Sequence, residues 1–347
     1  MTILSQPIEF TLPDSNVATD PPERRGVARD GVRLMVAHRP SGRVEHRTFH
    51  ELIDLLNPGD VLVVNTSRTI PAALDAVAED GTELRIHLAS PMADGMWSLE
   101  VRTPEPGGGT SPGPQLKPQT LTLPGGAMAH LLARSVRSSR LWIAVLEETN
   151  DLDRYLSAHG RPIRYLPGRE WPLSDYQTVF ATDPGSSEMP SAGRPFTTEM
   201  ATRLIARGIS MLPVTLHTGV SSFEDDESPG EEWFRVPAAT ATAVNALRAG
   251  GGRLIAVGTS VVRALETVAT PEGTLEPGEG LTELVVTPER GILAVDGLLT
   301  GWHEPHSSHL RLLEAIVGKT FLHRVYYEAL EAQYLWHEFG DELLIIR

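Results

Sequence analysis

Residues 253–266 constrain the fold of this chain most, because they predict a buried strand, a polar turn and a helix within fourteen residues. Residues 254–257 are apolar and rich in β-branched side chains, and Gly258 interrupts them. Thr259 or Ser260 can then cap the helix that follows. A strand, a tight turn and a helix in succession are typical of α/β proteins.

The turn after residue 257 is a candidate ligand site. It presents backbone N–H groups and the hydroxyls of Thr259 and Ser260 at the positive end of a helix, which suits a carboxylate, a phosphate or a ribose. The chain has neither the Gly-x-x-x-x-Gly-Lys motif nor the Gly-x-Gly-x-x-Gly motif, so the two commonest phosphate sites are not predicted. The alternative is that the turn only connects two elements.

The spacing of apolar residues along the chain changes twice. Before residue 71, a capping box of Thr48 and Glu51 predicts a helix that ends at Asn57-Pro58-Gly59, and a buried strand over residues 61–64 follows. Between about residues 72 and 148, apolar and polar residues alternate in short runs separated by Asp-Gly and Gly-Gly turns, which predicts antiparallel strands. After residue 151, helices are predicted over 197–207, 240–248, 261–268, 310–317 and 321–336, and strands over 211–216, 254–257 and 284–286.

This order predicts an α/β fold in which an inserted antiparallel β domain, barrel-like in character, interrupts an α/β main domain. The predicted limits are residues 1–71 for the first part of the main domain, 72–150 for the insertion and 151–347 for the second part. We expect the active site in the second part.

The composition excludes several classes of protein. The 347 residues contain no cysteine, which rules out disulfides, thiolate metal sites, iron–sulfur clusters and cysteine nucleophiles. The chain has no long apolar run and no signal-peptide pattern, so we expect a cytoplasmic protein that does not associate with a membrane. A net charge of −15 argues against broad nucleic-acid binding but allows a local basic patch. Basic residues cluster at Arg24, Arg25, Arg29 and Arg33, and at Arg134, Arg137 and Arg140.

Several segments, in order, resemble the S-adenosylmethionine:tRNA ribosyltransferase-isomerase family of queuosine biosynthesis. No single motif carries the resemblance, which covers both α/β portions, whereas the middle β portion is similar only in character. The matching residues are 10–13, 29–34, 56–60, 65–68, 70–71, 175–181, 190–193, 214–217, 253–266, 296–300 with His303 and Pro305, and 340–341.

The resemblance implies a transferase-isomerase that uses S-adenosylmethionine as the donor of a ribosyl group. In the family, this group passes to the aminomethyl group of a 7-deazaguanine at the wobble position of tRNA, giving epoxyqueuosine and releasing adenine and methionine. The implied partners are S-adenosylmethionine as co-substrate and tRNA as the default acceptor, and no metal is expected. Such a reaction needs a base, an acid and groups that hold the methionine carboxylate.

The resemblance also implies site residues. His217 and His303 match family histidines, and imidazoles suit both proton transfers near neutral pH. Arg68, Arg263 and Asp341 are implied as anchors for charged parts of the donor. For each residue there is a simpler alternative: a structural hydrogen bond for a histidine, a solvated surface charge for an arginine, and a turn cap for Asp341.

The chain departs from the family pattern at probable site positions. Arg194-Pro195 stand where the family has Leu-His, an acidic tract around Asp225 and Glu231 replaces a histidine pair with glutamate, and Leu335 replaces an arginine. These departures leave two alternatives open: a diverged paralogue with a small-molecule or other nucleotide acceptor, and an inactive homologue that only binds ligand. For a small acceptor, Arg194-Pro195 are expected to reshape the pocket.

The segment from His303 to His309 gives a separate hypothesis. His303, Glu304, His306 and His309 are all side chains that can bind zinc, within seven residues. The segment is not the His-Glu-x-x-His helix motif, and Pro305 prevents a regular helix through its first half. Contacts with substrate or solvent are the alternative that we favour.

Overall fold

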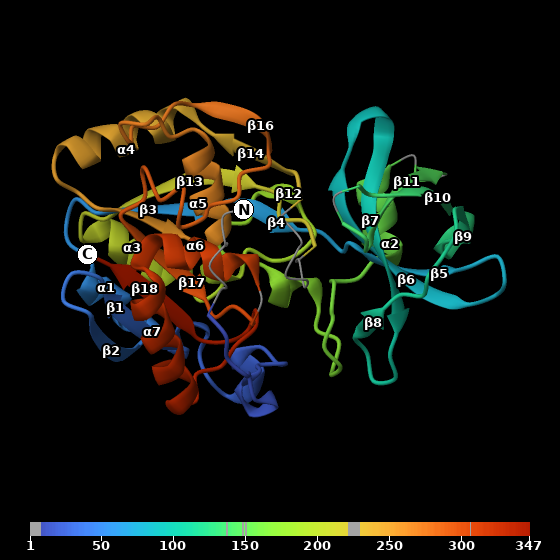
Figure 1. Ribbon diagram of the computed structural model, residues 1–347, viewed down its shortest axis with the longest axis horizontal. Helices are drawn as coiled ribbons and strands as arrows, with labels where there is room; N and C mark the ends of the chain where they lie inside the picture. Colours follow the sequence, from blue (N-terminus) through green and yellow to red (C-terminus); the bar gives the residue numbers. More distant parts are fainter. Residues whose placement is uncertain (1–7, 137, 148, 150, 221–229, 306) are drawn as a thin grey trace.

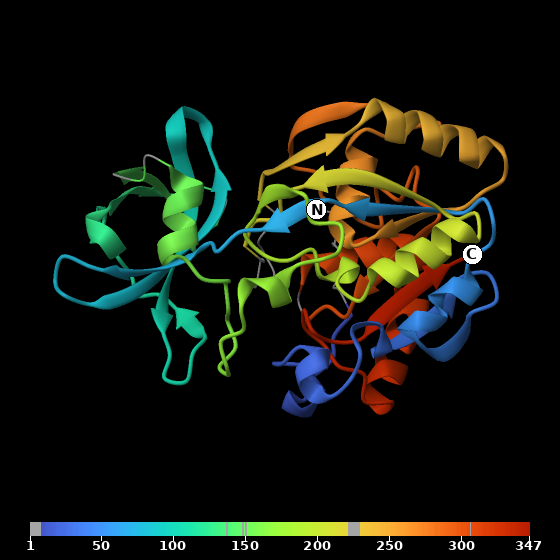
Figure 2. The same cartoon turned by 180° about the vertical axis from the view of Figure 1, so that it is seen from behind.

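The computed structural model describes residues 8–136, 138–147, 149, 151–220, 230–305 and 307–347. Figure 1 shows a large α/β body with a smaller β body beside it. Figure 2, from behind, places the C-terminus at the end of the large body remote from the smaller one. None of the helices in the described part of the chain has the length and apolarity that a membrane span requires.

The large body is built on a mixed sheet whose central strands are parallel. Strands β13, β3, β15 and β17 are consecutive and parallel, and β18 and β1 form a further parallel pair. The strand order is β16 (Gly278–Thr282), β14 (Glu232–Val236), β13 (Ser210–Leu216), β3 (Val61–Asn65), β15 (Leu254–Val257), β17 (Gly297–Gly301), β18 (Glu342–Ile346), β1 (Arg33–His38), β2 (Arg43–Thr48).

Helices cover both faces of this sheet. On one face, α1 (Leu52–Leu55) and α3 (Thr198–Ala206) pack against alternate residues of the central strands. The other face carries α4 (Ala238–Ala249), α5 (Thr259–Thr267), α6 (Ser308–Val317) and α7 (Lys319–Glu331). Because both faces are buried, the central strands are apolar throughout, as the sequence of residues 61–64 and 254–257 indicated.

The smaller body confirms the prediction of an inserted barrel-like antiparallel β structure. Its strands are β5 (Ala73–Val77), β6 (Glu83–Pro91), β7 (Met96–Pro104), β8 (Thr110–Pro112), β9 (Gln119–Thr122), β10 (Met128–Arg134) and β11 (Leu141–Glu147). The pairing of β11 with residues 96–100 of β7 closes six of these strands into a barrel. The seventh strand, β8, pairs with residues 102–104 at the end of β7. Helix α2 (Leu152–His159) packs on this barrel through Leu156. The domain limits at residues 71 and 150 stay predictions.

The local signals of the sequence were mostly, but not all, correct. The capping box of Thr48 and Glu51 is present at the start of the helical segment 49–55. The helix predicted to end near residue 336 stops at Glu331, because Gln333 adopts a left-handed backbone with φ 55°. The strand predicted at 284–286 is not formed, since Leu284 donates its N–H to Thr282 and accepts from Arg263.

The expected cap of α5 is also wrong. Thr259 already belongs to the helix, and Gly258 occupies the N-cap position with φ 98° and ψ 151°, a backbone conformation that side-chain-bearing residues rarely adopt. No side chain caps this helix among the described residues. The hydroxyls of Thr259 and Ser260 are therefore not used as caps.

Candidate functional site

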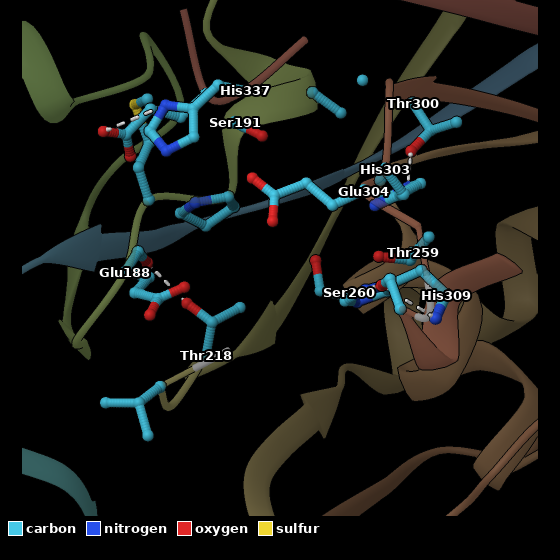
Figure 3. A pocket seen from close by; sticks show the side chains of 18 of the residues that line it. Glu188, Ser191, Thr218, Thr259, Ser260, Thr300, His303, Glu304, His309 and His337 are labelled. Atoms are coloured by element: carbon cyan, nitrogen blue, oxygen red, sulfur yellow. Dashed lines mark hydrogen bonds and ion pairs between the residues drawn. The ribbon is translucent and has the colours of Figure 1, made fainter. Parts of the chain in front are cut away.

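A pocket of about 280 Å³ lies at the edge of the large sheet where its parallel strands end. Strands β3, β13, β15 and β17 run in the same direction, so the residues after them meet at one edge, where α/β proteins usually bind ligands. Part of the pocket wall comes from the segments that follow β13, β15 and β17, and His337 near the C-terminus lies across from them (Figure 3). Residues 163–166, near the barrel, also line the pocket.

The turn after β15 forms one wall of the pocket. Gly258, Thr259 and Ser260 all line it, at the N-terminus of α5. The buried Asn65 fixes this turn: its Nδ2 donates to Ser260 Oγ at 3.2 Å and to the Leu216 carbonyl at 2.8 Å. One amide thus ties the ends of β3 and β13 to the start of α5.

Two stacked histidines form the wall after β17. The rings of His303 and His309 lie 4.5 Å apart with their planes 15° from parallel. His303 Nε2 is 2.9 Å from Thr300 Oγ1, and His309 Nδ1 is 2.9 Å from Ser307 Oγ. Burial, with the charge of His309, holds the pKa of His303 well below its usual value, and burial with the charge of Arg263 lowers the pKa of His309 to about 4. Both imidazoles are therefore neutral at pH 7.

Carboxyl side chains line the pocket from several directions. Glu304 points from the His303 side toward the side that carries His337 (Figure 3). Burial raises the pKa of Glu304, and burial together with the charge of Glu188 raises the pKa of Glu338 to about 8. Glu188 accepts a hydrogen bond of 2.9 Å from the hydroxyl of Tyr165. The pocket therefore combines groups that can hold a proton at neutral pH with neutral imidazoles.

His217 lies just beyond the lining of this pocket. Its Nδ1 is 2.7 Å from Ser67 Oγ, and its ring stacks on Trp233 with ring centres 5.0 Å apart. On its other side lies Gly185, where a Cβ atom would come within 2.7 Å of three ring atoms. Burial, the largest effect, lowers the pKa of this imidazole. The next residue, Thr218, does line the pocket.

The three residues that the resemblance implied as anchors of the donor lie in different surroundings. Arg263 lines the pocket, but its guanidinium is paired with Glu232 and donates to the carbonyl of Leu284 at 3.0 Å. Arg68 is exposed on β4 (Ser67–Thr69), which pairs with β12 (Asp183–Ser186), outside the pocket lining. Asp341 also lies outside that lining.

Asp341 is buried, and its carboxylate accepts hydrogen bonds from the backbone. Its two carboxylate oxygens each accept a backbone N–H, from Arg33 and from Leu335, both at 2.8 Å. These contacts join the start of β1 to the segment after α7. They match the simpler alternative, a turn cap, that the sequence analysis raised for this residue.

Of the positions that depart from the family pattern, Arg194, Pro195 and Leu335 are outside the pocket lining, whereas Gly230 and Glu232 of the acidic tract are part of it. Arg194 is buried, donates to the Asp175 carbonyl at 2.9 Å and pairs with Glu23 at 2.9 Å. Neither Arg194 nor Pro195 is among the residues that line the pocket, but the charge of Arg194 acts on the lining residue Glu338, and a change of pocket shape by this pair stays a prediction. Residues 221–229 of this tract, which include Asp225, lie outside the described residues, as does His306. Within the described residues, no group of three or more metal-ligating side chains is found.

The predicted basic clusters are largely engaged in internal contacts. Arg24 pairs with Asp175 at 3.4 Å, Arg29 with Glu23 at 2.8 Å and Arg140 with Glu100 at 2.7 Å. The guanidiniums of Arg25 and Arg33 donate to backbone carbonyls, and Arg134 stacks over Trp142, while Arg137 lies outside the described residues. These arginines are therefore poorly placed to form one free basic face.

The sequence analysis did not predict Glu188 and Glu338 as pocket residues, and it considered a third pocket residue, Glu304, in another role. Glu188 and Glu338 lie in irregular segments with no periodic pattern, and only tertiary packing brings them together. Glu304 was considered only as a metal ligand. Its neighbour His303 was the available signal, because consecutive residues of one loop after a strand end often reach the same site.

Comparisons with known proteins all give one family. A family model described as "Queuosine biosynthesis protein" matches residues 5–345. Relatives named S-adenosylmethionine:tRNA ribosyltransferase-isomerase from Thermotoga maritima and Symbiobacterium thermophilum are each 36% identical, covering 97% of this chain and 98% of their own. A crystal structure of S-adenosylmethionine tRNA ribosyltransferase from Thermotoga maritima aligns with a TM-score of 0.54 and 30% identity, covering 97% of this chain and 99% of that one.

Proposed function

Because this chain belongs to the queuosine biosynthesis protein family, we propose that it is an S-adenosylmethionine:tRNA ribosyltransferase-isomerase. The observation that carries the proposal is that the turn of residues 258–260 and His303, both in segments of family resemblance, line one pocket at the carboxyl ends of parallel strands. The proposed reaction moves the ribosyl group of S-adenosylmethionine to a 7-aminomethyl-7-deazaguanine in tRNA and releases adenine and methionine.

The pocket suits the charges of the donor. The methionine carboxylate is expected at the turn of Thr259 and Ser260, where the N-terminus of α5 supplies N–H groups, hydroxyls and a positive potential. The sulfonium and ammonium groups are expected near the carboxyl of Glu188, because Glu304 and Glu338, whose pKa values are raised, are the carboxyls that hold a proton. No metal is needed for this arrangement, since the donor already carries its own leaving groups.

We assign the proton transfers to residues that line the pocket. His303 is neutral at pH 7 and can accept the proton beside the sulfonium. Glu304, whose pKa is raised by burial, can hold the proton that departing adenine requires. For this role His303 Nε2–H donates to Thr300 Oγ1, which fixes the ring and leaves the lone pair of Nδ1 to accept the proton.

The remaining predicted site residues receive supporting roles. His217 holds the segment that carries Thr218 through its contacts with Ser67 and Trp233, and Arg263 holds the wall of α5 against Glu232. Arg68 is exposed, so a contact with the acceptor is its proposed role, and Asp341 stabilises the fold around the C-terminal wall. We propose that the protein acts in the cytoplasm, where uncharged and precursor tRNA are available.

The test is incubation of the purified protein with S-adenosylmethionine, with and without precursor tRNA, while adenine and methionine are quantified. We expect both products in equal amounts and only when precursor tRNA is present. Product release with a small amine but not with tRNA would point to the diverged paralogue. Binding of S-adenosylmethionine without release of either product would point to an inactive homologue.

A further inference from the structure

A second cavity, of about 300 Å³, adjoins the proposed reaction pocket on the barrel side. It lies between the barrel and the segment of residues 161–173. Arg164 lines both cavities, so the two share one wall. A ligand that leaves the first cavity along this wall therefore reaches the second.

The shared wall is held firmly against the barrel. Thr110 donates its backbone N–H to the Tyr165 carbonyl at 3.0 Å and its hydroxyl to the Arg164 carbonyl at 3.1 Å. Gly168 donates to the Gly107 carbonyl at 3.0 Å. Residues 107–110 belong to the barrel side, so the position of Arg164 is fixed by both parts of the chain.

The second cavity is cationic in a chain of net charge −15. Its lining includes three arginines and one acidic residue, Glu170. Arg161 is paired with Glu170 at 3.2 Å and with Asp75, and Arg85 is paired with Asp75 at 2.8 Å. Arg164 differs from both: it donates to the carbonyls of Leu166 and Gly168 and forms no ion pair with any described residue.

An aromatic side chain lies beside these cations. Trp171 lines the second cavity, together with Pro172 and Leu173. Nucleobases of single-stranded RNA loops are commonly held by stacking on aromatic rings, while arginines contact the phosphates between them. The cavity therefore offers the two kinds of contact that an unpaired nucleotide uses.

We propose that the second cavity binds the nucleotide next to the modified one in the acceptor RNA, with Arg164 contacting the phosphate that joins the two. The inference rests on the proposed function, because a polynucleotide acceptor whose modified base enters the first cavity must continue outward past its wall. Arg164 would give this acidic chain a cation for RNA that lacks a carboxylate partner among the described residues, unlike Arg24, Arg29 and Arg140, which are each paired with a carboxylate.

The test uses an anticodon stem-loop RNA that carries the precursor base, and measures its Kd over about 50–200 mM salt. We expect Arg164→Gln to weaken binding roughly tenfold at low salt and to reduce the slope of log Kd against log salt by about 1, as loss of one phosphate contact does. Arg154→Gln is the matched control, because Arg154 is an exposed arginine on α2, outside both cavities. The control should bind RNA like the wild type.

The same variants separate this inference from the proposed function. Arg164→Gln should raise the KM for RNA and leave the KM for S-adenosylmethionine unchanged. Wild-type turnover with an unaltered KM for RNA and an unaltered salt slope in Arg164→Gln would overturn the inference while the function stands. A wild type that neither binds nor modifies the RNA would overturn both.

Crosslinking with the wild-type protein tests the inference without a variant that has to fold. Stem-loops with 4-thiouridine at either position beside the modified base are irradiated with the protein, and the crosslinked peptides are identified by mass spectrometry. We expect crosslinks within residues 161–173 from one of the two positions. Crosslinks confined to other segments from both positions would contradict the inference.

Discussion

The imidazole rings of His303 and His309 stack at 4.5 Å in the pocket wall, where both residues are half-buried. Two imidazolium ions at this separation would repel each other, and neither ring has a carboxylate partner within 4.0 Å among the described residues. The pair is therefore stable in its neutral form, which leaves His303 free to accept a proton from a substrate.

The stacked pair predicts a loss of stability in acid. Burial lowers the pKa of His309 to about 4, below the ordinary value of 6.5. Between these two values the unfolded chain binds a proton at His309 that the folded protein does not, so the free energy of unfolding falls as pH decreases from about 6.5 to about 4. Urea unfolding of wild type and His309→Gln across this range checks it, and a variant with the same pH dependence as wild type would contradict it.

Glu338 predicts the opposite slope at higher pH. Burial and the neighbouring Glu188 raise its pKa to about 8, so the folded protein retains a proton that the unfolded chain releases above about pH 4.5. Stability contributed by this group is lost as pH rises from about 4.5 to about 8. Glu338→Gln should flatten that part of the unfolding profile, and Glu188→Gln should shift the fall to lower pH. Profiles that coincide with the wild type in both variants would exclude this coupling.

Replacement of Gly185 tests how tightly the His217 ring is packed. Gly185→Ala places a methyl group within 2.7 Å of the His217 ring, which must shift from the position in which Nδ1 contacts Ser67 Oγ at 2.7 Å. Gly280→Ala is the matched control, since its φ of 149° resembles the 154° of Gly185 but nothing lies within 4 Å of its added Cβ. We expect Gly185→Ala to be less stable than the control by about 1–3 kcal/mol in thermal or urea unfolding. Equal stability of the two variants would show that the ring adapts freely.

Asp341 is expected to act on stability and not on donor binding. Asp341→Asn removes one of two acceptors for buried backbone N–H groups, which should cost about 1–3 kcal/mol of unfolding free energy. The KM for S-adenosylmethionine should stay at the wild-type value. A large rise in that KM with unchanged stability would instead restore Asp341 as an anchor of the donor.

Much of the fold could be predicted because local signals agreed with tertiary packing. The capping box at Thr48 and Glu51 and the apolar runs at 61–64 and 254–257 each lie where the sequence indicated. The errors arose where local pattern and backbone geometry diverge. Gln333 ends α7 early through a left-handed conformation, and Gly258, rather than a hydroxyl residue, takes the N-cap of α5.

The site was only partly predictable for a related reason. Thr259, Ser260 and His303 follow strand ends, and strand order alone brings such residues to one edge. Glu188 and Glu338 come from irregular segments, whose approach to the pocket depends on contacts such as that of Tyr165 with Glu188. Such long-range contacts leave no periodic signal in the sequence.

The most direct test of the central claim follows label from the ribosyl carbons of S-adenosylmethionine into precursor tRNA, with wild type and His303→Gln compared. The account predicts transfer by the wild type and a rate about 10²- to 10⁴-fold lower for His303→Gln, because a positioned proton acceptor is removed. His217→Gln, which lies outside the pocket lining, should lose less. No label in tRNA with the wild type, or wild-type rates in folded His303→Gln, would contradict the account.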